Sequence, residues 1–146
     1  MKTLLAFTLS LLLLAPAARA SVDDALSYAL QAARPYIKEG FTVREDYWGG
    51  DLPVGQRKAI VHQLFKGNEY WFWMGTNTPN ARISVHIYDA KGNLAEVEYW
   101  PKPGVKKPNM AAARIIPKAS GSYYLMVEIE KSPLERTNWA LVYGFR

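Results

Sequence analysis

Aromatic side chains are the residues of this sequence best suited to bind a ligand. Six of them are the candidate ligand-binding residues: Tyr47, Trp48, Trp71, Trp73, Tyr99 and Trp100. Flat rings on the face of a β-sheet can stack against sugar rings. A buried aromatic side chain also removes about 150–250 Å² of surface from water when it packs in a hydrophobic core. The sequence therefore leaves two roles open for these residues, a sugar-binding platform or packing in the core and against a helix.

A basic segment follows the last two of these aromatic residues. Lys102, Lys106 and Lys107 are spaced by prolines between Pro101 and Pro108. A stiff, basic projection of this kind could meet an acidic polymer, an anionic lipid or a protein partner. The alternative is a solvated loop, whose prolines and lysines keep neighbouring strand edges from pairing.

Recognisable catalytic groupings are missing from the sequence. His62 and His86 are the only histidines, and neither has a nucleophile or carboxylate at a recognisable catalytic spacing. The Ser-Gly-Ser at 120–122 lacks the leading glycine of a nucleophile elbow. Glu96 and Glu98 would share one strand face about 7 Å apart. Neighbouring glutamates on a solvent face are commoner than a glycosidase pair. We therefore predict that the protein is not an enzyme and has no catalytic residues.

Calcium is the one metal ion for which the sequence offers candidate ligands. Asp89 and Asn93 could supply oxygen atoms, as could Glu45 and Asp46 together with Asp51. The alternation of an EF-hand is absent, and Asp and Asn are also the residues that tight turns require. We therefore predict a turn after Asp89, no metal site and no other cofactor.

Short β-strands must position most of these side chains. From residue 41 onward, runs rich in Val, Ile, Tyr, Phe and Trp alternate with turn residues such as Gly49-Gly50. About eight strands at this spacing predict a mainly β chain folded as an antiparallel β-sandwich. The predicted strands are 42–48, 58–65, 69–74, 82–88, 94–100, 111–116, 122–129 and 139–145.

Alternation within the strand at 69–74 raises the question of what covers its second face. Its even-numbered residues point into the sandwich, so Trp71 and Trp73 point out of it. Residues 21–33 show helical periodicity, with Pro35 close to the end of the helix. We expect the helix at 21–37 to cover the two tryptophans. Its apolar stripe would be Leu26, Ala29, Leu30, Ala33 and Ile37.

Several short motifs, taken in order, resemble a known family. They are GDLPVG at 50–55, LFKGNEY at 64–70, IYDAKGN at 87–93, SGSYYLMV at 120–127 and WAL at 139–141. This order resembles the bacterial pre-peptidase C-terminal domain, a small jelly-roll-like β-sandwich of exported proteins. The resemblance covers roughly residues 46–144 and implies a non-catalytic accessory or binding module. Members of that family usually follow a catalytic domain, whereas this sandwich follows a helix.

The first twenty residues have the three regions of a secretory signal peptide. Lys2 supplies a positive start, an apolar run extends over 4–14, and Ala18-Arg19-Ala20 forms a small-x-small cleavage site. The apolar run is well short of the roughly 20 residues that cross a bilayer. We therefore predict a chain without a membrane span, exported from a bacterium to the periplasm or the medium. Its parts are the signal peptide at 1–20, the helix at 21–40 and the sandwich at 41–146.

Composition limits the class of protein further. Cleavage before Ser21 leaves 126 residues, enough for one domain. The chain has no cysteine, so its core must stabilise the fold without disulfides. The mature part carries 16 basic and 13 acidic residues, a net charge of +3. That excess is too small for a dedicated nucleic-acid-binding protein.

These observations predict an exported, non-catalytic β-sandwich module with an accessory role or a ligand- or partner-binding role. The expected partner is a carbohydrate or another exported protein. The leading alternative is a carbohydrate-binding protein that uses surface Trp and Tyr residues. The second alternative is a small secreted hydrolase.

Overall fold

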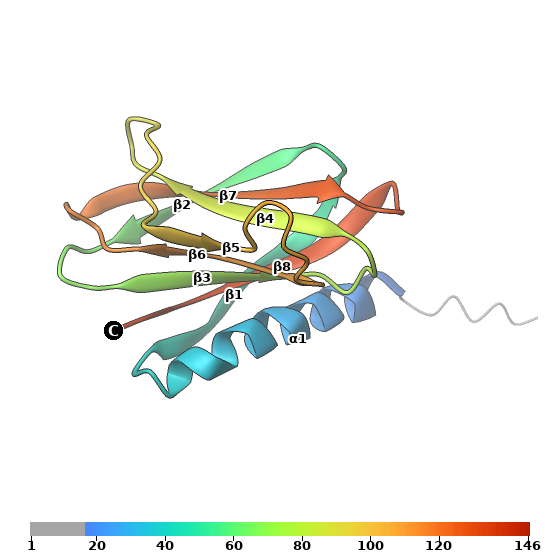
Figure 1. The fold of residues 1–146 in the computed structure, drawn as a ribbon, viewed down its shortest axis with the longest axis horizontal. Coiled ribbons are helices and arrows are strands. Elements are labelled where there is room, and N and C mark those ends of the chain that lie inside the picture. The colour runs from blue at the N-terminus through green and yellow to red at the C-terminus, as the bar shows by residue number, and fades with distance from the viewer. Residues whose placement is uncertain (1–16) are drawn as a thin grey trace, which may run out of the picture.

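The structure, a computed structural model, describes residues 17–146, which form a β-sandwich with one α-helix packed on it (Figure 1). The elements of this part of the chain are α1 Ala17–Ile37, β1 Thr42–Pro53, β2 Arg57–Leu64, β3 Tyr70–Gly75, β4 Arg82–Tyr88, β5 Glu98–Trp100, β6 Met110–Ile115, β7 Gly121–Lys131 and β8 Arg136–Phe145. The predicted class, a mainly β sandwich with an N-terminal helix, is confirmed.

Strand pairing follows the nested order of a jelly roll. β1 pairs with β8, β2 with β7 and β3 with β6, all antiparallel. One sheet has the order β1-β8-β3-β6-β5 and the other the order β2-β7-β4. The fourth nested pair is reduced to a bridge between Tyr88 and Leu94, and β5 pairs with β6 instead. β4 and β5 therefore each lie at one edge of their sheets, and both line one pocket.

The main core lies between the two sheets. Strict alternation places Ile83, Val85 and Ile87 of β4 in this core, whereas Ser84 and His86 remain partly exposed on the outer face. β3 and β7 contribute in the same way, because every second side chain of a strand points to the same face.

The outer face of β3 is covered by α1, as the sequence predicted. Trp71 and Trp73 lie beneath the helix and are 4% and 0% exposed. Figure 1 shows α1 running along the β3 side of the five-stranded sheet. The helix can come this close because β3 ends at Gly75, where a side chain would overlap the backbone of Ala25 and Ala29.

The apolar stripe of α1 differs from the predicted one. Leu30 and Ile37 are 41% and 55% exposed and do not lie against the sheet. The predicted residues Leu26, Ala29 and Ala33 do pack against the sheet, because bulky indole rings leave room mainly for small side chains on the helix. The buried helix residues are Ala25, Ala29, Ala32 and Ala33, with Leu26 and Tyr36 partly buried beside them.

Two strands differ most from their predicted bounds. β1 continues through Gly49-Gly50, which the sequence indicated as a break. A Cβ on Gly49 would lie 3.2 Å from the carbonyl oxygen of Trp139, so glycine serves close packing here. The strand expected at 94–100 forms only at Glu98–Trp100. Residues 94–97 bridge the two sheets instead: Ala95 N–H donates to the Ile87 carbonyl, and Val97 N–H donates to the Arg114 carbonyl.

Residues 1–16, which hold most of the predicted signal peptide, lie outside the residues that the structure describes. Within the described part of the chain, no helix is long and apolar enough to span a membrane.

Candidate functional site

The six candidate aromatic residues do not form one platform. Trp71 and Trp73 are buried under α1, so neither can present a ring face to a sugar. Tyr47 is exposed on β1, and Trp48 is half-buried with its ring 5.1 Å from that of His62. Tyr99 and Trp100 lie on the edge strand β5. Of the two roles that the sequence left open, packing against the helix holds for Trp71 and Trp73, because α1 occupies the face on which they lie.

Tyr99 and Trp100 remain together with the basic loop. These neighbouring residues of β5 pack on opposite sides of the five-stranded sheet, Tyr99 against the main core and Trp100 against the cluster beneath α1. The loop after β5 folds back over both of them. The Nζ atom of Lys102 lies 3.7 Å from the Tyr99 ring centre, and that of Lys107 lies 4.2 Å from the Trp100 ring. Lys106 is exposed.

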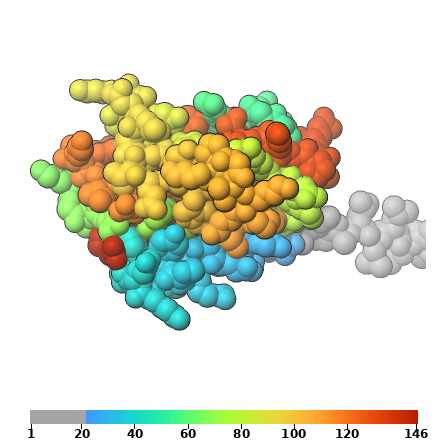
Figure 2. Space-filling model, viewed as in Figure 1, coloured from blue at the N-terminus to red at the C-terminus, as the bar shows by residue number. Residues whose placement is uncertain are grey.

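A pocket of about 400 Å³ lies between α1 and this loop, and we call it the Trp100 pocket. Its residues come from the second half of α1 and the turn after it, from β5, and from the loop and strand that follow β5. They are Gln31, Ala32, Pro35, Tyr36, Glu39, Trp100, Lys107 and Met110. An aromatic wall therefore meets an amide, a carboxylate, a phenol and an ammonium group. Figure 2 shows the loop in the middle of this face, directly above the helix.

Trp100 is fixed in this pocket by Tyr36. The indole Nε1–H of Trp100 donates a hydrogen bond of 3.1 Å to the Tyr36 hydroxyl. The Tyr36 ring in turn lies 4.9 Å from that of Trp71. Burial raises the pKa of Tyr36, so its phenol stays protonated over the physiological range. The Tyr36 O–H is thus a neutral donor at the wall of the pocket.

A network of charged residues lies on the same side of the sheet as Tyr36. Glu69 accepts one hydrogen bond from Arg114 and one from Arg146, each 2.9 Å long. Arg114 also donates to Glu98 at 3.0 Å. Burial alone would raise the pKa of Glu69, but the two arginines outweigh it and lower the pKa. The charges and hydrogen-bonding groups of these four side chains are paired with one another, so they are not free to bind a ligand.

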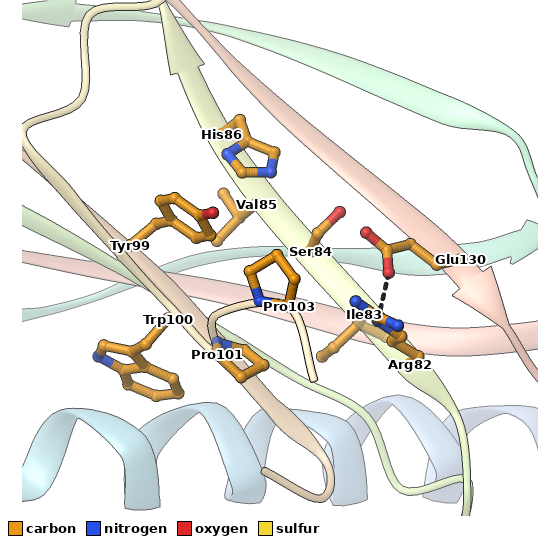
Figure 3. Close-up of a pocket in the computed structure, with 10 residues that line it drawn as sticks. All are labelled: Arg82, Ile83, Ser84, Val85, His86, Tyr99, Trp100, Pro101, Pro103 and Glu130. Carbon is orange, nitrogen blue, oxygen red and sulfur yellow. Dashed lines mark ion pairs between the residues drawn. The ribbon is translucent and has the colours of Figure 1, made fainter. Parts of the chain in front are cut away.

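A second, smaller pocket of about 110 Å³ lies between the edge strands β4 and β5 (Figure 3). We call it the His86 pocket. Its walls include Ser84, His86 and Tyr99, and an ion pair of 2.7 Å between Arg82 and Glu130 lies at one side. The ring of His86 lies edge-on to Tyr99 with 5.2 Å between ring centres.

His86 has a carboxylate partner that sequence reasoning missed. Its Nδ1 lies 2.8 Å from Oε1 of Glu96, whose side chain is only 2% exposed. The hydrogen bond to Glu96 raises the pKa of His86, although burial opposes this shift. Glu96 and Glu98 were expected to share a strand face. They separate because residues 94–97 are not a strand, and Glu98 pairs with Arg114.

Two polar oxygen atoms near His86 are buried and have no hydrogen-bond partner among the described residues. They are Oγ of Ser84 and Oε2 of Glu96. A carboxylate, an imidazole and a hydroxyl thus lie near one another. The structure gives no hydrogen bond between Ser84 and His86, which a serine nucleophile and its base would share.

The remaining candidate residues have contacts typical of a structural role. His62 lies between the rings of Trp48 and Tyr143, and burial lowers its pKa. Oδ1 of Asp89 accepts hydrogen bonds of 2.9 Å from the backbone N–H groups of Lys91 and Asn93, as expected for a turn. Within residues 17–146, no group of three or more His, Asp or Glu side chains is arranged to hold a metal ion.

Comparison with known proteins does not assign this chain to a family. No protein-family model matches the sequence, and no curated protein matches it. The resemblance to the pre-peptidase C-terminal domain therefore stays a prediction.

Proposed function

We propose that this chain is an exported, non-catalytic β-sandwich module that binds a ligand in the Trp100 pocket. The lining of this pocket carries the proposal. Tyr36 and Trp100 are held rigidly by their hydrogen bond, and Lys107 lies over the indole ring. Ligand sites typically combine an apolar wall with a few convergent polar groups.

A carbohydrate is the ligand class that this lining fits best. Sugars present C–H groups to apolar side chains and hydroxyl groups to amide, carboxylate and ammonium groups. Gln31 and Glu39 are exposed polar side chains on the helix side of the pocket, and Lys107 faces them from the loop. Another exported protein that inserts a polar side chain beside Trp100 is the competing partner class.

Electrophoresis in native gels that contain soluble polysaccharides tests the carbohydrate assignment. A β-glucan, a xylan and an alginate provide neutral and acidic probes. We expect at least one of them to slow the wild-type protein, and the double variant Gln31→Ala/Lys107→Ala to lose at least about tenfold in affinity, because each lost polar contact contributes about 0.5–1.5 kcal/mol. Both side chains are exposed, so the fold should persist.

The matched control is Gln56→Ala/Lys131→Ala, which removes the same two side-chain types from exposed positions outside the pocket. It should bind as the wild type does. If no polysaccharide slows the wild type, the carbohydrate assignment is wrong. If the control loses as much affinity as the pocket variant, the ligand binds elsewhere.

The non-catalytic part of the proposal has a separate test. We expect no turnover of ester, peptide or glycoside substrates by the purified protein, because Ser84 Oγ is buried and unpaired. Turnover that disappears in both Ser84→Ala and His86→Ala, with unchanged denaturation midpoints, would instead identify a hydrolase. His62→Ala serves as the histidine control, because His62 does not line the His86 pocket.

A further inference from the structure

Two loops lie side by side at the end of the sandwich where β1 begins and β8 ends (Figure 1). They are residues 65–69, between β2 and β3, and residues 116–120, between β6 and β7. The backbone N–H of Lys66 donates a hydrogen bond of 2.8 Å to Oγ of Ser120, which joins them. We call the pair of loops the tip.

Each loop of the tip begins with an exposed apolar side chain. Phe65 is 54% exposed and Ile116 is 50% exposed. Each follows a residue that is completely or almost completely buried at the end of its strand, Leu64 and Ile115. Two large apolar side chains are therefore exposed to water at the same end of the molecule, one from each sheet.

The charge of the tip is positive. Lys66 and Lys118 are exposed beside the two apolar residues. Glu69 is the one acidic residue in the two loops, and Arg114 and Arg146 both bind its carboxylate. The nearby loop between β4 and β5 adds the exposed Lys91 and Leu94, which is 61% exposed, although it also holds Asp89, whose carboxylate accepts backbone hydrogen bonds.

Projecting apolar side chains flanked by lysines fit one kind of surface. They line neither of the two pockets described above. A bilayer interface accepts apolar side chains among its acyl chains, while its anionic headgroups attract the neighbouring lysines. We propose that the tip docks peripherally on the surface of a bilayer that contains anionic lipids. This proposal does not depend on the ligand assigned to the Trp100 pocket.

Sedimentation with lipid vesicles tests the docking. The probes are vesicles of phosphatidylcholine alone and vesicles with about one third phosphatidylglycerol, compared at low and raised salt. We expect the wild-type protein to sediment with the anionic vesicles and to be released by salt. Phe65→Ser/Ile116→Ser should lower the partition coefficient at least about tenfold, because apolar burial scales with the area removed from water. Lys66→Glu/Lys118→Glu should remove the preference for anionic lipid.

The matched controls are Leu134→Ser and Lys131→Glu, which change an exposed apolar and an exposed basic residue near the opposite end of the sandwich. Both should sediment as the wild type does. The proposal is wrong if the wild type fails to bind anionic vesicles, or if the controls lose as much binding as the tip variants. It is also wrong if only the lysine variant loses binding, since the tip would then recognise charge alone.

A second measurement does not depend on the stability of those variants. The chain has no cysteine, so a single thiol can carry a polarity-sensitive dye at Phe65→Cys or, as the control, at Leu134→Cys. Anionic vesicles should shift the emission of the dye at position 65 to the blue and leave the dye at position 134 unchanged. Equal shifts at both positions, or none at position 65, would contradict insertion of the tip.

Discussion

At the scale of single residues, His86 and Glu96 form the pair through which pH should act on this fold. Glu96 belongs to the segment that bridges the two sheets, and its side chain is almost completely buried. The hydrogen bond from His86 therefore helps to hold that segment against β4. Because the bond raises the pKa of His86, the folded protein binds this proton more tightly than the unfolded chain does.

The stability that His86 contributes should fall as pH rises. The contribution is complete below the unfolded pKa of about 6.5 and is lost as pH increases through the raised pKa of the folded state. We expect the loss of melting temperature caused by His86→Gln to be larger at about pH 5.5 than at about pH 9. The change in unfolding free energy should be about 1 kcal/mol or less, since a third of the side chain is exposed. Thermal unfolding of both proteins at the two pH values measures it.

His62 provides a control of opposite sign. Burial lowers its pKa, so its neutral form is favoured by folding, and its contribution is lost as pH falls below about 6.5. His62→Gln should therefore relieve part of the acid destabilisation of the wild type. Equal effects of pH on the two variants would show that neither histidine carries the dependence.

At the scale of elements, the contact between α1 and β3 depends on one glycine. A Cβ at position 75 would overlap the backbone of Ala25 and Ala29, which cannot move without displacing the helix. We expect Gly75→Ala to lower the unfolding free energy by about 3 kcal/mol, the upper part of the range for overpacking. Its tryptophan emission should shift to the red, because Trp71 and Trp73 would gain contact with water.

Urea unfolding measures the free energy of unfolding of Gly75→Ala, with Gly121→Ala as the control. A Cβ at Gly121 would meet no atom within 4 Å, so that variant should stay within about 0.5 kcal/mol of the wild type. Deletion of residues 21–38 should reproduce the red shift more strongly and lower the melting temperature. A wild-type emission spectrum in all three variants would mean that the helix does not shield the two indoles in solution.

At the scale of the whole molecule, the predicted export of the chain can be tested on the full-length protein. The small residues at Ala18 and Ala20 predict cleavage before Ser21. N-terminal sequencing of the protein from its native host should therefore begin at Ser21. Ala18→Asp/Ala20→Asp should leave an unprocessed and longer chain, because the cleavage site requires small residues. An intact Met1 on a wild-type protein in the cytoplasm would contradict the prediction.

The sequence by itself determined most of the strands, the faces of β3, β4 and β7, and the place of the helix. Alternation is a local property, because the side-chain period of a strand follows from its backbone geometry. Two apolar faces on β3 therefore required a cover for Trp71 and Trp73, and the chain offered one helix for it. The predicted stripe was correct for Ala29 and Ala33, whereas the exposure of Leu30 and Ile37 could not be read from periodicity alone.

Tertiary structure alone decided which polar groups meet. Tyr36 and Trp100 are 64 residues apart and come together only because β5 pairs with β6 next to β3, beneath the helix. The partnership of His86 with Glu96 needed the segment after β4 to leave its predicted strand and bridge the sheets. Local periodicity carries no information about such non-local pairings, so the Trp100 pocket and the His86 pocket were visible only in the folded chain.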